Sequence, residues 1–323
     1  MPRPIPSMQV ALIISSALGL PLLHALVGQG AVSAVAVPHT PAHPDEPNQV
    51  AQAAAALSLP VTRLHHPTLA ADLRAWLGDT PPAAVLVFML PWRVPAALLA
   101  VPEWGFLNFH LAALPAYRGP EPLFWVLRNG EAAGAMTVHR MAEGFDTGPV
   151  LLSQPVPIGP ADTHGLHRAR LAHAAVGVGQ QLLAGLRGEV PLPPEQPQDE
   201  AAARTWPRAT LADVCLNWSE PAEAIARLVR ATNPWNRGAL ASLRGQPLRV
   251  LAATPRPEPV AAPPGTVVWA EPGQGLLVAC GAGQLLQFDI VALDEGYLTG
   301  GQLAALGVGV GEVLGTVPSP PVG

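Results

Sequence analysis

The chain has 323 residues, of which 49% are hydrophobic and 13% charged, and its net charge is −5. This length favours two domains that each bury a core, and the acidic balance excludes tight, non-specific nucleic-acid binding through a basic surface. All 18 basic residues are arginine, so chemistry that needs a nucleophilic or Schiff-base lysine is excluded.

The N-terminus opens on a short proline-rich stretch, residues 1–7, followed by the apolar run Met8–Ser15. Proline interrupts the charged region that a signal peptide would need, and no apolar run reaches the roughly 18 residues of a membrane span. We therefore expect a cytoplasmic protein without a membrane segment. Residues 1–7 are expected to be a disordered tail, or Met8 the true start.

Strand and helix patterns alternate through the first half of the chain. This rhythm predicts a Rossmann-like, doubly wound and mostly parallel α/β sheet, in which ligands bind beyond the carboxyl ends of the strands. The expected strands are Val10–Ser15, Val32–Val37, Val61–Leu64, Ala84–Leu90 and Phe106–His110, and the expected helices are Leu18–Val27, Val50–Leu57, Leu69–Leu77 and Val94–Leu99.

The rest of the chain predicts the end of this domain at residue 187, a proline-rich linker at 188–210 and a second domain at 211–323. The linker composition is typical of a semi-rigid spacer. Short strands and a Gly-Ala-Gly hairpin signal predict that the second domain is a small, OB-like β-barrel. The expected elements are the helix Pro122–Arg128, strands Ala135–Met141 and Val150–Val156, the long helix Thr163–Leu186, a helix capped by Ser219, and strands Leu248–Ala252, Gly265–Ala270, Leu276–Cys280 and Leu285–Leu293.

Three polar side chains stand out at the end of the first half: Asn108, His110 and Asp146. The first two alternate along one expected strand, so they share a face. Asp146 lies in a glycine-flanked loop after another strand. An amide, an imidazole and a carboxylate can together polarise a carbonyl, hold an oxyanion and move a proton. Each residue alone is more often structural, since aspartate in a glycine loop usually forms a turn.

The surrounding residues strengthen the functional interpretation. Asn-x-His-x-x-x-Leu-Pro-x-x-Arg-Gly at 108–119, followed by Asp-Thr-Gly at 146–148, resembles the formyltransferase family that uses 10-formyltetrahydrofolate. Leu216–Pro221 and Leu228–Trp235 look like the entry to that family's C-terminal domain. The resemblance implies one-carbon (formyl) transfer, with Asn108, His110 and Asp146 as the catalytic residues.

The mechanism that the resemblance implies begins with attack of a substrate amine on the formyl carbon carried by N10 of the folate. Asn108 and a protonated His110 are expected to donate hydrogen bonds to the oxyanion, each worth about 3 kcal/mol. Asp146 is expected to orient His110, to favour its charged form, and to take the amine proton directly or through water.

The resemblance also implies where the co-substrate 10-formyltetrahydrofolate and the acceptor bind. The folate is expected against Val87–Pro91 and the loop after Leu114. Arg118 and Gly119 are the expected substrate contacts, although Arg118 is equally well explained as a surface arginine. No metal is expected. The expected folate contacts are Phe88, Met89, Leu90, Leu114, Pro115 and Gly144.

The chain departs from the family pattern in three places. Ala112 stands where the family usually has serine, and Ser15–Ala17 replaces a glycine-containing turn. The segment Pro38–Pro47, which is long and basic in members that use tRNA, has no arginine here and two acids.

Charge also bears on the acceptor, because Thr205–Gly323 carries seven arginines against nine acidic residues. This balance favours a small-molecule amine, such as a nucleotide-linked amino sugar, over methionyl-tRNA. Methionyl-tRNA formyltransferase is the alternative, and a 10-formyltetrahydrofolate hydrolase or an inactive folate-binding paralogue are further alternatives. The acceptor is thus a small molecule or initiator tRNA, and no obligate protein partner is indicated.

Overall fold

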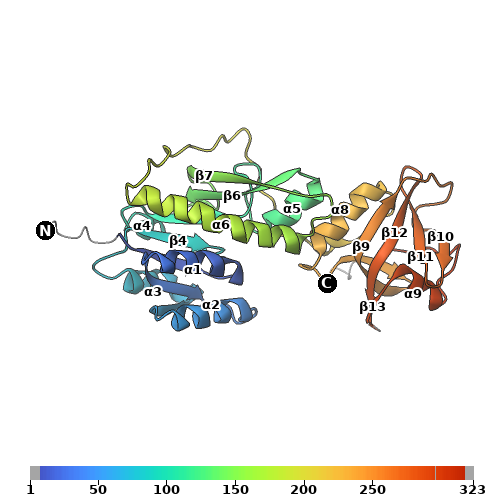
Figure 1. Cartoon of the computed structure of the whole chain (residues 1–323), viewed down its shortest axis with the longest axis horizontal. Helices are drawn as coiled ribbons and strands as arrows, with labels where there is room; N and C mark the ends of the chain where they lie inside the picture. Colours follow the sequence, from blue (N-terminus) through green and yellow to red (C-terminus); the bar gives the residue numbers. More distant parts are fainter. Residues whose placement is uncertain (1–7, 295, 317–323) are drawn as a thin grey trace. The chain divides into compact units, whose positions relative to one another are not determined.

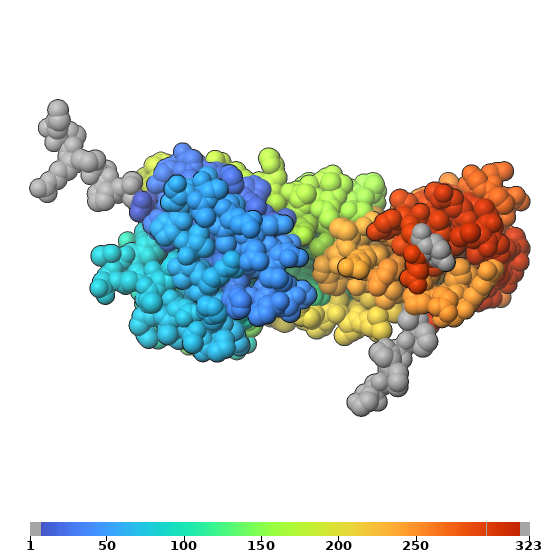
Figure 2. Space-filling view, turned by 90° about the horizontal axis from the view of Figure 1, so that it is seen from below, coloured from blue at the N-terminus to red at the C-terminus, as the bar shows by residue number. Residues whose placement is uncertain are grey.

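The computed structural model describes residues 8–294 and 296–316, so the expectation for residues 1–7 lies outside the described chain. Contacts divide the chain into two units (Figure 1). Unit 1 takes the chain up to Pro122, with Ala133–Pro157 and Arg168–Trp206. Unit 2 takes Leu123–Ala132, Ile158–His167 and the chain from Pro207 onward. The space-filling view colours these parts along the chain, with the first βα units in blue to cyan (Figure 2).

Unit 1 is built on a seven-stranded sheet in the order β3-β2-β1-β4-β5-β6-β7. The first five strands in that order pair in parallel, and β6 and β7 pair antiparallel. This arrangement confirms the expected parallel-rich α/β sheet. The strands are β1 (Val10–Ile14), β2 (Val32–Pro38), β3 (Val61–Leu64), β4 (Ala84–Phe88), β5 (Phe106–His110), β6 (Ala133–Arg140) and β7 (Val150–Pro157).

Helices cover both faces of this sheet, which explains why β1 and β4 are buried along their whole length. On one face, α3 and α4 pack against side chains that include Ile13 and Val85. On the other face, α6 comes so close to α1 and β5 that a Cβ at Gly179 would meet Leu22 and Phe109. The helices are η1 (Ala17–Gly19), α1 (Leu20–Gly28), α2 (Asp45–Ala56), η2 (His66–Thr68), α3 (Leu69–Leu77), α4 (Ala96–Leu99) and α6 (His164–Leu186).

Unit 2 contains an antiparallel sheet in the order β10-β11-β12-β9-β8, with β13 paired to β12. The segment 311–315 forms isolated bridges with both edges of this sheet, through Thr266↔Val313 and Ser242↔Gly315. The expected closure into a small, OB-like barrel stays a prediction. The elements are α5 (Pro122–Asn129), α7 (Leu211–Val214), α8 (Ala222–Thr232), β8 (Ala239–Leu243), β9 (Gln246–Arg256), β10 (Val267–Glu271), β11 (Gly275–Cys280), β12 (Gln284–Leu293), β13 (Gly296–Leu298) and α9 (Gly300–Ala305).

The proline-rich segment after α6 makes backbone pairs with earlier parts of the chain. Gln196 pairs with Val150 of β7, and Thr205 pairs with Arg118, in isolated β-bridges. The segment up to Trp206 therefore groups with unit 1, where its backbone hydrogen bonds are satisfied. Composition records the lack of a helix or strand pattern, but it cannot show pairing with distant parts of the chain.

Within residues 8–294 and 296–316, none of the helices combines the length and the apolar character needed to cross a lipid bilayer.

Candidate active site

The site begins with the antiparallel pairing of β5 and β6. Asn108 lies opposite His139, and His110 lies opposite Thr137. Because side chains alternate along each strand and directly paired residues share a face, these four polar side chains project from the same side of the sheet. They lie at the carboxyl end of β5, where a doubly wound sheet binds its ligands.

Asp146 reaches this group from the loop between β6 and β7. Its backbone adopts a φ of 56°, a left-handed conformation that aspartate tolerates better than most residues. Its Oδ2 accepts a hydrogen bond of 2.9 Å from the Gly119 N–H. Its Oδ1 lies 3.5 Å from His110 Nδ1 and 3.5 Å from His139 Nε2. The structure thus brings Asn108, His110 and Asp146 together, as the sequence predicts.

His110 is buried, with 6% of its surface exposed, and its Nε2 donates a 2.6 Å hydrogen bond to the Tyr117 carbonyl. Burial lowers the pKa of His110 below its ordinary 6.5, although Asp146 and the Tyr117 carbonyl act in the opposite direction. The Asp146 carboxylate thus favours the charged form of His110, as expected, but burial outweighs this effect. Because Nε2 holds its proton toward the Tyr117 carbonyl, the neutral form of His110 turns an unprotonated Nδ1 toward the carboxylate, and this nitrogen can accept a proton.

Asp146 is held in its ionised form. Burial by itself would raise the pKa of this carboxyl. A hydrogen bond from His139, the charge that His110 can carry and the Gly119 N–H outweigh burial and lower the pKa to about 2. At neutral pH the carboxylate therefore keeps a full negative charge between the two imidazoles.

His139 belongs to the site, although its sequence position gave no reason to select it. It is 2% exposed, and its Nδ1 donates a 3.0 Å hydrogen bond to the Arg140 carbonyl. The remaining nitrogen, Nε2, lies 3.1 Å from Asn108 Nδ2. When neutral it accepts from the Asn108 amide, and when protonated it can donate to Asp146.

A small hollow of about 40 Å³ opens beside this group. Its lining contains both polar and apolar groups, and Arg93 lies 4.9 Å from the centre of the Phe145 ring at its rim. Two of the expected folate contacts, Leu90 and Gly144, lie in this lining. The lining residues are Leu90, Arg93, Asn108, His139, Met141, Ala142, Gly144, Phe145 and Asp146.

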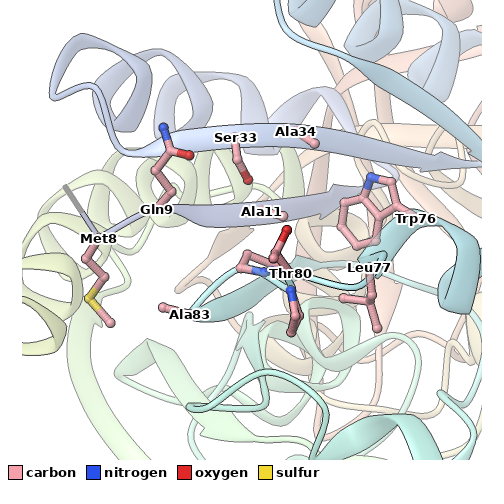
Figure 3. A pocket seen from close by; sticks show the side chains of 11 residues that line it. Met8, Gln9, Ala11, Ser33, Ala34, Trp76, Leu77, Thr80 and Ala83 are labelled. Atoms are coloured by element: carbon pink, nitrogen blue, oxygen red, sulfur yellow. The ribbon is translucent and has the colours of Figure 1, made fainter. Parts of the chain in front are cut away.

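A much larger hollow, of about 350 Å³, lies at the other end of the strands (Figure 3). It is lined by residues at the amino ends of β1, β2 and β4, including Gln9, Ser33 and Ala83. None of its lining residues is acidic, basic or a histidine. Size alone would therefore misplace the site, whereas the position of the titratable groups identifies it.

Phe88 is not available to a ligand at this site. In the parallel register of β4 and β5, Val87 pairs with Asn108 and Phe88 pairs with Phe109. Phe88 therefore faces the opposite side of the sheet from Asn108, where it packs 6.2 Å from the Phe109 ring and is 1% exposed. The expected folate contact at Phe88 is corrected by this register.

The other expected contacts lie around the site. Met89 is 41% exposed at the end of β4, where the Ser15 hydroxyl donates to its carbonyl. This bond gives the unusual turn after β1 a structural role. Leu114 and Pro115 are joined by a cis peptide bond in the loop that leads to Tyr117. None of these three residues lines the small hollow.

Arg118 and Gly119 face the protein, not a ligand. The Gly119 N–H is bonded to Asp146, as described above. Arg118 is 5% exposed, and its guanidinium donates to Gln198 and forms a bidentate pair with Glu200. The expected contact of Arg118 with a substrate phosphate or carboxylate is therefore replaced by bonds within unit 1.

An amide, two imidazoles and a carboxylate that meet at the carboxyl edge of a parallel sheet can orient a substrate and move a proton, which is the chemistry that acyl transfer needs. The sequence contains matches to two models, "Formyl transferase" over residues 38–180 and "Formyl transferase, C-terminal domain" over residues 208–301. The chain belongs to the formyl transferase family, and it is a one-carbon transferase.

Relatives and solved structures agree with this assignment. Methionyl-tRNA formyltransferase from Thiobacillus denitrificans is 36% identical over 271 residues, which cover 82% of this chain and 84% of the relative. The structure of WlaRD, a sugar 3N-formyl transferase, superposes with a TM-score of 0.65 at 12% identity, over 87% of this chain and 97% of that chain. HypX from Aquifex aeolicus, in complex with tetrahydrofolic acid, superposes with a TM-score of 0.60 at 18% identity, over 92% of this chain and 47% of that chain.

Proposed function

We propose that this enzyme transfers the formyl group of 10-formyltetrahydrofolate to the amine of methionyl-tRNA. The observation that supports formyl transfer is the meeting of Asn108, His110 and Asp146 beside one small hollow. The acceptor is supported by the relative from Thiobacillus denitrificans, a methionyl-tRNA formyltransferase similar to this chain over most of both sequences.

The first step forms a bond between the amine nitrogen and the formyl carbon, and the carbonyl oxygen becomes an oxyanion. The Asn108 amide is the donor for this oxyanion, because its Nδ2 carries a second N–H besides the one facing His139. Removing one such donor costs about 3 kcal/mol in transition-state stabilisation. The donor role expected for a protonated His110 is not needed in this scheme.

The amine must lose a proton for the intermediate to collapse toward product. His110 Nδ1 faces the ionised Asp146 at 3.5 Å, and the carboxylate stabilises the imidazolium that forms when this nitrogen takes the proton. The carbon–N10 bond then breaks, and N10 takes up a proton as tetrahydrofolate leaves. The products are the N-formyl amide and tetrahydrofolate.

The lining of the same hollow supports a position for the folate. Leu90, Met141 and Phe145 give it apolar walls, and Asn108 and Asp146 give it polar ends. Apolar walls with a few convergent polar groups are typical of sites for a heteroaromatic ring. We therefore place the reactive end of 10-formyltetrahydrofolate against Leu90 and Gly144, with the formyl carbon toward Asn108.

The small-molecule acceptor that the sequence favours has weaker support. It rests on the acidic balance of residues 205–323 and on the likeness to a sugar formyl transferase, which at 12% identity shows the fold alone. The methionyl-tRNA formyltransferase relative is three times as similar in sequence. We therefore take methionyl-tRNA as the acceptor and keep the amino sugar as its competitor.

The test measures conversion of 10-formyltetrahydrofolate to tetrahydrofolate by the purified protein. Four reactions are compared: the protein alone, with charged methionyl-tRNA, with uncharged tRNA, and with a panel of nucleotide-linked amino sugars. Asp146→Asn serves as the inactive control. We expect turnover only with charged methionyl-tRNA, and its loss by a factor of at least about 100 in the control.

Each alternative has its own outcome in this assay. If turnover occurs only with an amino sugar, the acceptor is that amino sugar and not methionyl-tRNA. Equal turnover without any acceptor would identify a hydrolase. Folate binding without turnover in any reaction would identify an inactive folate-binding protein, and would overturn formyl transfer altogether.

A further inference from the structure

The segment 195–206, which we call the strap, runs along the active-site loops within unit 1. Within the strap, the side-chain amide of Gln198 makes four hydrogen bonds. Nε2 donates 2.7 Å bonds to the carbonyls of Asp146 and Gly148. Oε1 accepts bonds of 3.0 and 2.9 Å from Nε and Nη2 of Arg118. One amide therefore joins the loop that carries Asp146 to the loop that follows His110.

The orientation of this amide is fixed by its partners. The Arg118 guanidinium can only donate, so it must face Oε1, and the two carbonyls can only accept, so they must face Nε2. All the ordinary hydrogen-bonding capacity of the amide is used. No other common side chain of this length supplies two donors and one oxygen in this arrangement, which makes Gln198 a specific bridge.

The strap is also anchored on the C-terminal side of Gln198. Toward its end, the Trp206 ring stacks on Tyr117 at 5.7 Å and 10°, and the Arg118 N–H donates to the Arg204 carbonyl. On the same guanidinium, Glu200 forms a bidentate pair with bonds of 3.0 and 2.7 Å. Tyr117 is also the residue whose carbonyl accepts from His110. The strap thus contacts the supports of both His110 and Asp146.

We propose that Gln198 is a positioning residue for formyl transfer, which sets the Asp146 carboxylate at its distance from His110 and His139. It acts through the backbone of the Asp146 loop and touches neither substrate nor reacting atoms. The carboxylate must stay within hydrogen-bonding reach of two imidazoles at once, and a misplacement of about 1 Å can cost a factor of about 100 in rate. This inference rests on the proposed function only for its activity readout.

The test uses Gln198→Glu, which can still accept from Arg118 but cannot donate to the two carbonyls. Gln198→Met, which keeps the length and loses all four bonds, is the second variant. Gln196→Glu is the matched control, because Gln196 is exposed and its substitution adds the same negative charge two residues away from Gln198. We expect Gln198→Glu to lower kcat by a factor of about 10 to 100, with KM for the folate changed less than about threefold. Gln196→Glu should stay within about twofold of the parent enzyme.

Amide hydrogen exchange gives a second readout that does not need activity. The Gly119 N–H is held by the Asp146 carboxylate itself, so its exchange rate reports where that carboxylate lies. Exchange at Gly119 should rise in both Gln198 variants and not in Gln196→Glu, with the melting temperatures compared alongside.

The two readouts separate this inference from the proposed function. If the parent enzyme transfers no formyl group, the proposed function fails, and the exchange of Gly119 still decides the positioning role. Unchanged Gly119 exchange in the Gln198 variants, or a kcat equal to that of Gln196→Glu in an active enzyme, would overturn it. If the Gln198 variants melt at a lower temperature while kcat and the exchange of Gly119 stay unchanged, the role of Gln198 is purely structural and the inference is overturned.

Discussion

At the scale of single residues, the site depends on one carboxylate shared by two buried imidazoles. His110 and His139 each place a nitrogen 3.5 Å from the same oxygen of Asp146. Only one nitrogen of each ring is free for this role, because Tyr117 and Arg140 carbonyls hold the other. The backbone thus fixes which nitrogen of each imidazole meets the carboxylate.

His139 can be tested by a variant that keeps one of its two functions. Gln at this position can still accept from the Asn108 amide through Oε1, but it cannot carry a proton to Asp146. We expect His139→Gln to lower kcat about tenfold, with a smaller change in KM for the folate. A kcat equal to that of the parent enzyme, with only KM changed, would assign His139 to binding instead.

The low pKa of Asp146 links stability to pH. Its folded pKa of about 2 lies below the ordinary value of 3.8, so ionisation stabilises the folded state above about pH 4. This contribution, about 2 kcal/mol in full, is lost as the pH falls through the folded pKa, and about 1 kcal/mol is lost between pH 5 and pH 3. His110, whose pKa burial also lowers, acts in the same direction below its ordinary 6.5.

Urea unfolding of the parent enzyme and of Asp146→Asn at pH 5 and pH 3 measures the Asp146 contribution directly. The stability advantage of the parent over the variant should shrink by about 1 kcal/mol between these pH values. An advantage that is constant with pH would mean that Asp146 has an ordinary pKa in the folded protein.

At the scale of elements, the loop between β6 and β7 is closed by a glycine that allows no side chain. A Cβ at Gly148 would lie 1.8 Å from the Arg140 carbonyl oxygen, a backbone atom that cannot turn away. We expect Gly148→Ala to lower the free energy of unfolding by about 2 kcal/mol or more and to displace Asp146.

Gly177 on α6 is the matched control, because a Cβ there meets no atom within 4 Å. Gly177→Ala should be neutral or stabilise by up to about 1 kcal/mol, since alanine favours the helix. Chemical denaturation of both variants checks the pair. If the two substitutions change the free energy of unfolding equally, the close approach of Gly148 to the Arg140 carbonyl does not prevent a side chain at position 148.

The same scale shows what the sequence could predict. Continuous apolar runs such as Ala84–Phe88 predicted the buried strands, and the spacing of Asn108 and His110 predicted their common face. His139 was missed because its role needs the antiparallel pairing of β6 with β5, which no local pattern encodes. The strap was missed for the same reason, because Gln198 meets Arg118 across 80 positions.

At the scale of the whole molecule, charge bears most directly on the acceptor. Residues 207–323 contain seven arginines, and two of these, Arg230 and Arg244, pair with Glu223 and Glu312. Each phosphate neutralised by an arginine releases counterions and steepens the salt dependence of binding by about 0.9 in a log–log plot. Because these seven arginines are outnumbered by nine acidic residues in the same part of the chain, tRNA recognition cannot rest on many phosphate contacts there.

We therefore expect a shallow salt dependence for an enzyme that accepts tRNA. The slope of log kcat/KM for methionyl-tRNA against log salt concentration should lie between about −2 and −4. The same plot for the folate, measured at saturating tRNA, is the control and should be nearly flat. A slope steeper than about −6 would reveal a phosphate-binding surface that the charge balance does not indicate. A slope near zero would mean that the phosphates of the tRNA contribute nothing, and would return the nucleotide-linked amino sugar to first place as the acceptor.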